Sequence, residues 1–320
     1  MENRATLLRP PPDDPKKAPI ENALEVTELA VLGPNIFTNT RPPWHPPGAR
    51  GIYGGAVIAM CLAAAQRTVA SDFLVHSCHC YFLLAGSSEQ AILFHVEQVR
   101  DGRSFATRTV QARQRGRCIF TTTISFVRES SSGEPGTEPE LLTQGPFQGT
   151  KIEVVDREGP KPGEKKTRQW MRARGSISGG PMAHLEALAY VSDSYFIGTI
   201  TRIHKLWRFP FKAEDYDDLP QDLQQKVATL HRWEGMGEHP HEMIGRPAIG
   251  MMVSLDHTIY FHEPTKVRAD EWMMSEMQSP WAGDGRAVVM QKIFSKDGTL
   301  LATCVQEQPL KPEEGHESKL

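Results

Sequence analysis

The sequence predicts an α+β protein made of two similar halves, each a single helix followed by antiparallel strands. The first half reads GGAVIAMCLAAAQ, then LVHSCHCYFLLAG and RDGRSFATRTVQARQ. The second half repeats that order with GGPMAHLEALAYVSDSYF, VSLDHTIYFHEP and GDGRAVVMQKIFSKDG. Helices and strands that come in separate blocks favour an antiparallel sheet packed on a helix over an alternating parallel fold. The repeated order indicates an internal duplication.

The first half is predicted to span residues 24–130, after a disordered lead-in over residues 1–23. The lead-in is rich in proline and charge and has no apolar core of the kind a secretory signal needs. Residues 24–39 alternate well enough for a strand and a turn. The proline-rich run 41–51 favours a loop, because proline has no N–H to give to a helix or a strand ladder.

A small-residue helix is predicted to follow this loop and to be wrapped by strands. Gly54 and Gly55 open it, and its apolar run continues to about Val69. Four segments rich in β-branched and aromatic residues come next, separated by turns that contain glycine. This order predicts an antiparallel meander that curves around the helix.

The second half is predicted to span residues 167–309, joined to the first by a polar linker over 131–166. Pro181 suits the first turn of its helix, which we expect to run to about Phe196. Residues 201–245 have no counterpart in the first half, and their DLPQDLQQKVATLHRW portion favours a peripheral helix. Four further strands should complete the second meander. A polar tail, residues 310–320, closes the chain.

Composition excludes several classes of function. The 320 residues carry a net charge of −3 with both signs interspersed, so no basic stripe is available to neutralise a nucleic acid backbone. The longest apolar runs are too short to span a membrane. Five cysteines in a chain without a secretory signal favour reduced thiols. Neither nucleic acid nor a membrane span is therefore expected.

The HSCHC segment invites a metal site, but strand alternation argues against one. His76, Cys78 and Cys80 should point to one side of a strand while Ser77 and His79 point to the other. No CxxC or HExxH spacing occurs anywhere in the chain. We therefore expect no metal site.

The second half also carries a polar set that the first half lacks. Aligning the Gly pairs, the Tyr-Phe pairs and the Asp-Gly-Arg turns picks out Asp193, Ser254 and Gln306. None of the aligned residues of the first half is ionisable: Thr68, Val75 and Ile124. A duplicated fold with one equipped half suggests an enzyme with a single site.

Each of the three residues has an ordinary structural explanation beside a catalytic one. Asp193 is either a helix-end carboxylate in water or a base whose pKa is raised by apolar neighbours. Ser254, at the start of a predicted strand, is either a hydroxyl bound to its own backbone or a ligand for water. Gln306 continues an apolar strand face, so its amide either bonds the backbone as an ordinary buried glutamine or helps to hold a water. A water held by all three would satisfy them together.

Several segments together resemble the type II acyl-CoA thioesterases. They are GIYGGAVIA, LVHSCHCYFLLAG, VRDGRSFATRTVQARQ, YVSDSYF, VSLDHTIYFH and ATCVQE, spread over about residues 25–308. The resemblance implies two fused hot-dog domains that hydrolyse acyl-CoA to a free acid and CoA without a metal or organic cofactor. It places Asp193, Ser254 and Gln306 on the catalytic trio of the family, with Ser or Thr at the middle position. It also implies that His76 lies near the site.

Two departures from the family pattern concern substrate binding. Leu84, Ala85 and Gly86 stand where the family commonly has Arg-Pro-Gly after the Tyr-Phe-Leu strand. The insertion over 201–245 is also long, so the family's acyl preference does not carry over to this chain.

Direct attack by water is the mechanism that these residues favour. Asp193 would take a proton from a water oriented by Ser254 and Gln306, and backbone N–H groups at a helix start, near Gly55 or Gly180, would stabilise the oxyanion. No GxSxG elbow surrounds the serine, so an acyl-enzyme is not expected.

The chain ends in a tripeptide that resembles the peroxisomal import address: Ser318, Lys319 and Leu320. An import receptor is therefore an expected partner and the peroxisome the expected location. Fusion of two domains should also give an internal pseudo-dimer, and pairing at sheet edges could build a homo-oligomer.

Two alternative functions remain at this stage. A hot-dog enoyl-CoA hydratase or dehydratase would need an Asp and a His together, usually in a DxNPxH segment, which this chain lacks. Asp256 and His257 adjoin in sequence but should face opposite sides of a strand. A non-catalytic acyl-binding protein would be expected to lack the polar trio.

Overall fold

The predicted α+β class and the repeated order of one helix and a meander are confirmed. The computed structural model describes residues 9–128, 142–144, 146–150, 152–155, 161–209 and 211–312. The first half contains α1 (Pro19–Leu24), β1 (Val26–Glu28), β2 (Ile36–Asn39), α2 (Gly54–Gln66), β3 (Phe73–Phe82), β4 (Leu93–Asp101), β5 (Phe105–Gln114) and β6 (Arg117–Arg128). The second half contains β10 (Lys166–Ala173), α3 (Gly180–Val191), α4 (Gly198–His204), α5 (Gln221–Trp233), β11 (Ile249–Met252), β12 (Asp256–Phe261), β13 (Met273–Gly283), β14 (Arg286–Ser295) and β15 (Leu300–Pro312).

One continuous sheet joins the two halves. Its strand order is β1-β2-β4-β5-β6-β3-β12-β15-β14-β13-β10, continued by short strands beyond β10. The first strand after each helix lies at the centre, where β3 and β12 pair antiparallel with Cys80 opposite His257. Reading outward from this pair, the two sides of the sheet mirror each other. The arrangement is the tandem double hot-dog, with the halves related as the subunits of a dimer would be.

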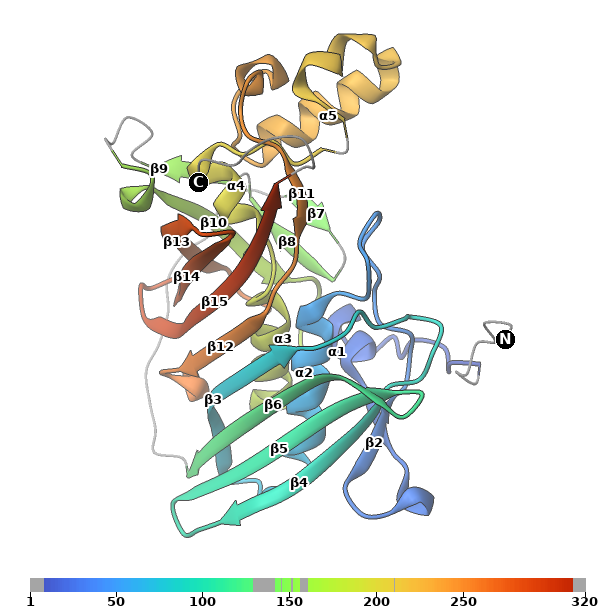
Figure 1. Cartoon of the computed structure of the whole chain (residues 1–320). Coiled ribbons are helices and arrows are strands. Elements are labelled where there is room, and N and C mark those ends of the chain that lie inside the picture. Colours follow the sequence, from blue (N-terminus) through green and yellow to red (C-terminus); the bar gives the residue numbers. More distant parts are fainter. Residues whose placement is uncertain are drawn as a thin grey trace.

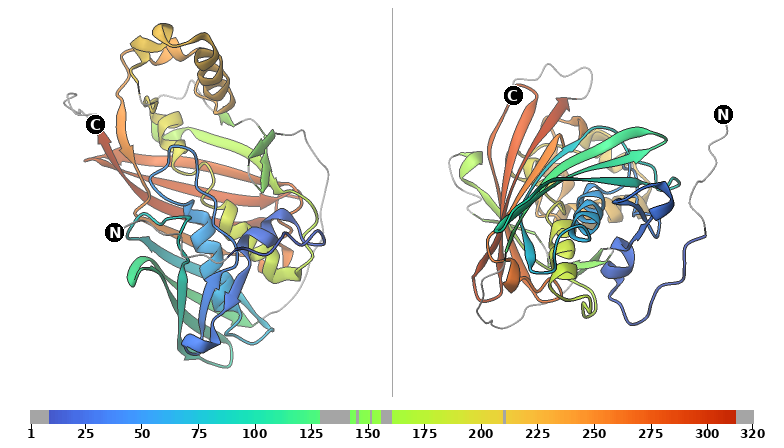
Figure 2. Two further views of the ribbon diagram at one scale, coloured as in Figure 1. Left: turned by 90° about the vertical axis from the view of Figure 1, so that its right-hand side faces the viewer. Right: turned by 90° about the horizontal axis from the view of Figure 1, so that it is seen from below.

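The two long helices pack against each other on the concave side of the sheet (Figures 1 and 2). In α2 every residue from Gly55 to Gln66 is buried, because its small and apolar side chains cover all faces of the helix. The end of α3 meets the start of α2, so the helices run antiparallel. This contact places the end of the second-half helix α3 against the start of the first-half helix α2.

The predicted insertion begins within α4, which packs on β13, and the part expected to be a peripheral helix forms a helical lobe at one end of the molecule. Its long helix is α5, of which Val227 and His231 are buried, and Figure 1 shows it standing away from the sheet. A separate small core holds Trp207, Ala213 and Met243. No helix among the described residues is both long and apolar enough to cross a membrane.

The lead-in differs from the expectation of disorder. Within residues 1–23, α1 begins at Pro19 and buries Ile20, which is 0% exposed. Ile20 and Leu24 lie one helical turn apart, so even this short helix has one apolar side to place against α2 and α3. The polar composition of residues 1–23 gave no indication that Ile20 and Leu24 would be buried. Residues 1–8 lie outside the described residues.

The described parts of the predicted linker also differ from the expectation, because they add strands to the sheet. Besides β7 (Leu142–Gln144), they hold β8 (Phe147–Gly149) and β9 (Glu153–Val155), both paired with β10. The tail begins as a strand too, since β15 continues to Pro312. The predicted targeting residues Ser318, Lys319 and Leu320 lie outside the described residues.

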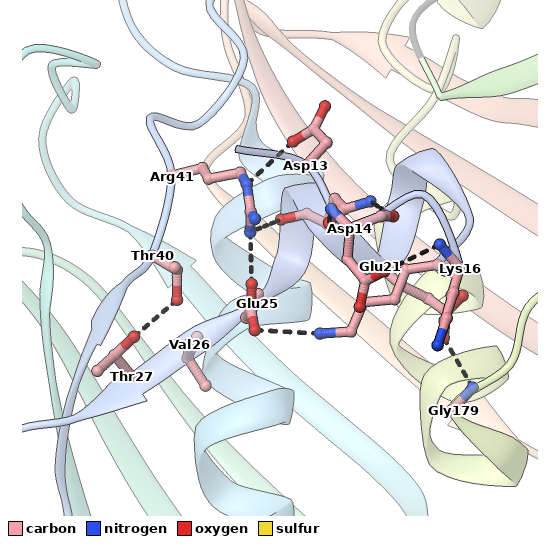
Figure 3. Close-up of polar contacts among 12 residues, drawn as sticks. Asp13, Asp14, Lys16, Glu21, Glu25, Val26, Thr27, Thr40, Arg41 and Gly179 are labelled. Carbon is pink, nitrogen blue, oxygen red and sulfur yellow. Dashed lines mark hydrogen bonds and ion pairs between the residues drawn. The ribbon is translucent and has the colours of Figure 1, made fainter. Parts of the chain in front are cut away.

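Glu21 of α1 binds the start of α3. Its carboxylate accepts hydrogen bonds from the N–H groups of Ser178 (3.0 Å), Gly179 (2.7 Å) and Ala18 (2.7 Å). Figure 3 shows this contact and, beside it, Arg41 holding Asp13 and Glu25. A carboxylate is favoured at a helix N-terminus because the free N–H groups and the helix dipole are positive there. The N-terminal segment is thus fixed across the beginning of the second helix.

Replacing Glu21 by alanine should lower the free energy of unfolding by about 1–2 kcal/mol, the usual cost of losing a helix cap. Burial alone would raise the pKa of Glu21, but the backbone donors outweigh it and the pKa is lowered. The stabilisation should therefore be complete at neutral pH and fade as the pH falls through the acidic range. Denaturant titration of both proteins at several pH values measures this. Glu28→Ala, at an exposed position, is the control, and a loss of stability no larger than that control's would contradict the cap.

Candidate active site

The start of α2 and the end of α3 meet at a buried carboxylate. Asp193 lies two residues beyond the last residue of α3, and the N–H of Gly55 donates to its Oδ2 at 2.9 Å. Glycine is required at this contact, since a Cβ on Gly55 would lie 2.3 Å from the carbonyl oxygen of Tyr190. The two halves therefore approach each other closely enough for the helix N-terminus of one to bind an anion of the other.

The environment of Asp193 prepares it to exchange a proton near neutral pH. The residue is only 9% exposed, and its Oδ1 has no hydrogen-bond partner among the described residues. Burial raises the pKa of the carboxyl to about 7, even though the Gly55 hydrogen bond acts in the opposite direction. A buried carboxylate with a raised pKa and one unbonded oxygen has the properties expected of a general base that accepts a proton from water.

Ser254 and Gln306 are in direct contact, whereas the sequence predicted a water held between them and Asp193. Gln306 lies on β15, is 0% exposed, and donates from Nε2 to the hydroxyl of Ser254. Ser254 does not begin the strand as predicted, because β12 starts only at Asp256. Instead it lies in a loop just before β12. The next residue, Leu255, fixes this loop, because its carbonyl oxygen accepts from the N–H of Phe82 and its N–H donates to the carbonyl oxygen of Glu307, at 3.0 Å each.

His257 is the residue that sequence reasoning missed. Its ring is 0% exposed, with Nδ1 2.9 Å from Oε1 of Gln306 and Nε2 2.9 Å from the hydroxyl of Ser192. Burial lowers its pKa to about 4, against the opposing effect of Gln306, so the ring is neutral at physiological pH. A signal was present in the sequence: His257 interrupts an otherwise apolar strand face.

A chain of contacts joins the three predicted residues, although Asp193 makes no hydrogen bond to Ser254 or Gln306 among the described residues. His257 connects Gln306 to Ser192, the residue directly before Asp193. From the other side, Gly54 lies so close to Asp193 that a Cβ there would be 2.8 Å from Oδ2. The hydrogen bonds thus run from Ser254 through Gln306 and His257 to Ser192, and the side chain of Asp193 lies at the start of α2.

An aromatic pocket of about 210 Å³ adjoins this junction. Its wall includes Trp44, Tyr53, Phe147 and Tyr190, together with Ser194, the residue after Asp193. The hydroxyl of Tyr53 is 2.9 Å from both the carbonyl oxygen of Tyr190 and Oγ of Ser194, which locks the aromatic rings in place. The pocket is therefore a mainly apolar space whose wall includes the residue that follows Asp193 in sequence.

His76, predicted to lie near the site, is placed elsewhere. A β-bulge between Val75 and Ser77 breaks the alternation of β3. The His76 ring consequently contacts Ser125 at 2.8 Å and half-exposed Phe105. None of its hydrogen bonds or ring contacts among the described residues reaches the predicted trio.

The other end of the helix pair is filled by different groups. Gly180 starts α3 at this end, where Glu21 binds the neighbouring N–H groups. Thr68, aligned with Asp193, accepts from the buried guanidinium of Arg108 at 2.8 Å, and Arg108 in turn pairs with Asp101. Of the two predicted helix starts, only that of Gly55 therefore lies at the carboxylate. Within the described part of the chain, no cluster of His, Cys, Asp or Glu is arranged to hold a metal ion.

Comparisons with known proteins agree with this architecture. The family profile of the acyl-CoA thioesterase N-terminal domain matches residues 40–127, and that of the acyl-CoA thioesterase C-terminal domain matches residues 128–308. The chain therefore belongs to the acyl-CoA thioesterase family, with both domains in tandem. It is a hydrolase of thioester bonds, and its substrates are acyl-CoA molecules.

Two of the similar proteins cover most of the chain, and a third covers about a third of it. Acyl-coenzyme A thioesterase 8 of Homo sapiens is 32% identical over an alignment that covers 93% of this chain and 90% of the human protein. The solved structure of the acyl-CoA thioesterase II TesB2 from Mycobacterium marinum has 29% identity and a TM-score of 0.66, covering 93% of this chain and 99% of that one. Peroxisomal acyl-coenzyme A thioester hydrolase 1 of Saccharomyces cerevisiae is 34% identical over 36% of this chain and 33% of its own length.

Proposed function

We propose that the chain hydrolyses acyl-CoA with a water activated by Asp193 and oriented by Ser254 and Gln306. The observation that carries this proposal is the state of Asp193: a buried carboxylate with a pKa of about 7, one oxygen bound by Gly55 and the other without a partner. A water on the free oxygen would remove an unsatisfied buried acceptor and stand ready to lose a proton.

The reaction proceeds in two steps that balance without a covalent enzyme intermediate. Asp193 takes one proton from the water while the water oxygen bonds to the thioester carbonyl carbon, giving a tetrahedral oxyanion. The N–H of Gly54, which has no partner among the described residues, is the donor we assign to that oxyanion at the start of α2. The C–S bond then breaks, the CoA thiolate leaves, and Asp193 returns the proton to it.

The aromatic pocket is the part of the site that we assign to the acyl group. It adjoins Asp193 through Ser194 and Tyr190, and its walls are predominantly apolar rings. Burying an acyl chain there is favourable at about 0.8 kcal/mol per methylene. Trp44 and Tyr53 come from the first half and Tyr190 from the second, so the proposed acyl site draws on both sides of the duplication.

Single turnover in H₂¹⁸O tests direct attack by water. With enzyme in excess over octanoyl-CoA, the first product acid should carry one ¹⁸O, and rapid-quench samples should contain no acylated protein. Direct attack puts the solvent oxygen straight into the acid, so Asp193 should stay unlabelled. Mass spectrometry measures all three species. Protein heavier by one acyl group at early times, or an unlabelled acid, would show that a side chain and not water is the nucleophile.

The peroxisome is the location that we propose for this activity. The carboxyl-terminal Ser318-Lys319-Leu320 has the form of a peroxisomal import address. The yeast relative, which matches part of the chain, is named as a peroxisomal enzyme. Both observations point to an import receptor as the partner of the tail.

A further inference from the structure

The position of the proton on the His257 ring determines which groups donate and which accept along a chain of hydrogen bonds. Four groups lie in series: the hydroxyl of Ser192, the ring of His257, the amide of Gln306 and the hydroxyl of Ser254. The imidazole is sealed from solvent, with the ring of Phe196 packed edge-on at 5.3 Å between centroids. A neutral imidazole has one N–H donor and one acceptor nitrogen. If it donates to Gln306 it must therefore accept from Ser192, and the reverse.

With the proton on Nδ1, His257 donates to the carbonyl oxygen of Gln306. The amide nitrogen of Gln306 then faces Ser254 and donates to its oxygen, as the structure has it. Ser254 keeps its own hydroxyl hydrogen free to donate elsewhere. At the other end, Nε2 accepts from the hydroxyl of Ser192, whose hydrogen then turns away from the carbonyl oxygen of Ala189.

With the proton on Nε2, the chain runs the other way. His257 would donate to Ser192, whose hydroxyl could remain on the carbonyl oxygen of Ala189 at 2.9 Å. Nδ1 would then require a donor, so the amide of Gln306 would have to turn over. Its oxygen would face Ser254 and capture the hydroxyl hydrogen.

We infer that His257 is a positioning residue, protonated at Nδ1, that holds the amide nitrogen of Gln306 against Ser254 and so leaves the Ser254 hydroxyl hydrogen free to bind the reacting water. The inference rests on the proposed function, in which Ser254 orients that water. A donor at Ser254 fixes the water through a lone pair, while Asp193 accepts one of its protons. With the opposite tautomer, Ser254 would offer the water only an acceptor and compete with Asp193 for its proton.

The position of the ring supports this role over simple packing. An apolar side chain would fill the same core without polar atoms to satisfy, whereas His257 places both nitrogens within 2.9 Å of side chains that lead into the site. Its low pKa keeps a second proton off the ring, so one neutral tautomer serves over the working range of pH.

Two substitutions separate the two ends of the imidazole. In His257→Asn the amide nitrogen can take the place of Nδ1 and still donate to Gln306, but the contact with Ser192 is lost. In His257→Gln the amide reaches the place of Nε2 and can keep Ser192, but the donor to Gln306 is lost. We expect kcat of His257→Asn to stay within about tenfold of wild type and that of His257→Gln to fall about 100-fold, with KM changed little in both, since misplacing a site group by about 1 Å costs that much.

The tautomer itself can be measured on the wild-type enzyme. Two-bond ¹⁵N–¹H correlation spectra of uniformly labelled protein distinguish Nδ1–H from Nε2–H, and the His257→Asn spectrum identifies the signal by its absence. We expect a proton on Nδ1 that persists from pH 6 to pH 8. A proton on Nε2 would overturn the inference, and so would equal losses of kcat in the two variants.

Gln306→Ala distinguishes failure of this inference from failure of the proposed function. If Gln306→Ala retains wild-type kcat, the proposed water site itself is wrong. If Gln306→Ala is impaired while both His257 variants turn over like wild type, the water site stands and only the role of His257 is refuted.

Discussion

Replacing Asp193 by asparagine should lower kcat by about 10³-fold or more, because removal of a general base costs about 10²–10⁴ and asparagine cannot accept the proton at all. The amide can still accept from the Gly55 N–H, so the helix contact that holds the site is retained. KM should change little. Thiol release under saturating acyl-CoA measures the effect, and a purified variant with wild-type turnover would refute the mechanism.

The same carboxylate should set the pH dependence of the wild-type enzyme. Burial raises its pKa to about 7, and only the ionised form can take a proton from water. The value of kcat/KM should therefore rise with pH through about 7 and level off above it. A profile with no inflection between pH 5 and pH 9 would show that Asp193 is not the titrating base.

Stability provides the control for the Asp193→Asn variant. A raised carboxyl pKa stabilises the folded state below the unfolded pKa of about 4, and this contribution is lost as the pH rises through about 7. Asparagine does not ionise, so the variant does not lose this stability as the pH rises. Asp193→Asn should thus be at least as stable as wild type at pH 8, with an advantage that shrinks toward pH 4. A variant that is inactive but equally stable places the loss in the chemistry and not in the fold.

Gly55→Ala should abolish most activity and destabilise the protein. The added Cβ would lie 2.3 Å from the carbonyl oxygen of Tyr190 and 2.6 Å from the ring of Tyr53, so the start of α2 must move away from α3. Overpacking of this kind costs about 1–3 kcal/mol, and displacement of the Gly55 N–H by 1 Å costs about 100-fold in kcat. Activity and thermal unfolding measured together report both effects.

Gly180→Ala is the matched control for that prediction. It changes the aligned glycine at the start of the other helix, where an added Cβ would meet nothing within 4 Å. Its φ of +72° is unfavourable for alanine, so a loss of about 1 kcal/mol is expected from backbone strain alone. Its kcat should match wild type. Equal losses of kcat in the two variants would mean that the start of α2 has no special part in the reaction.

Local sequence patterns predicted the main helices and the central strands well. The Gly pairs marked where α2 and α3 begin, and β-branched runs marked the central strands, because helix and strand periodicity follow directly from which side chains must be buried. These features depend on short stretches of chain.

Features that depend on contacts distant in sequence were not predictable in the same way. The bulge that turns His76 outward arises where β3 pairs with β6, and no residue within β3 signals it. Likewise, α1 and β8 gain their order from surfaces of the second half, against which they pack. The partners of His257 could not be predicted either, because they lie 65 and 49 residues away along the chain.

Glu21 and Arg108 give the duplicated chain a lasting asymmetry. A homodimer of single domains would present two equivalent clefts, and both would bind and turn over ligand. Here Glu21 binds the N–H of Gly179 and Arg108 binds Thr68, so other groups occupy the end of the helix pair that corresponds to the proposed site. The proposed function therefore predicts one active site per polypeptide, and a tight inhibitor should titrate the enzyme at a stoichiometry of one per chain and without cooperativity between the halves.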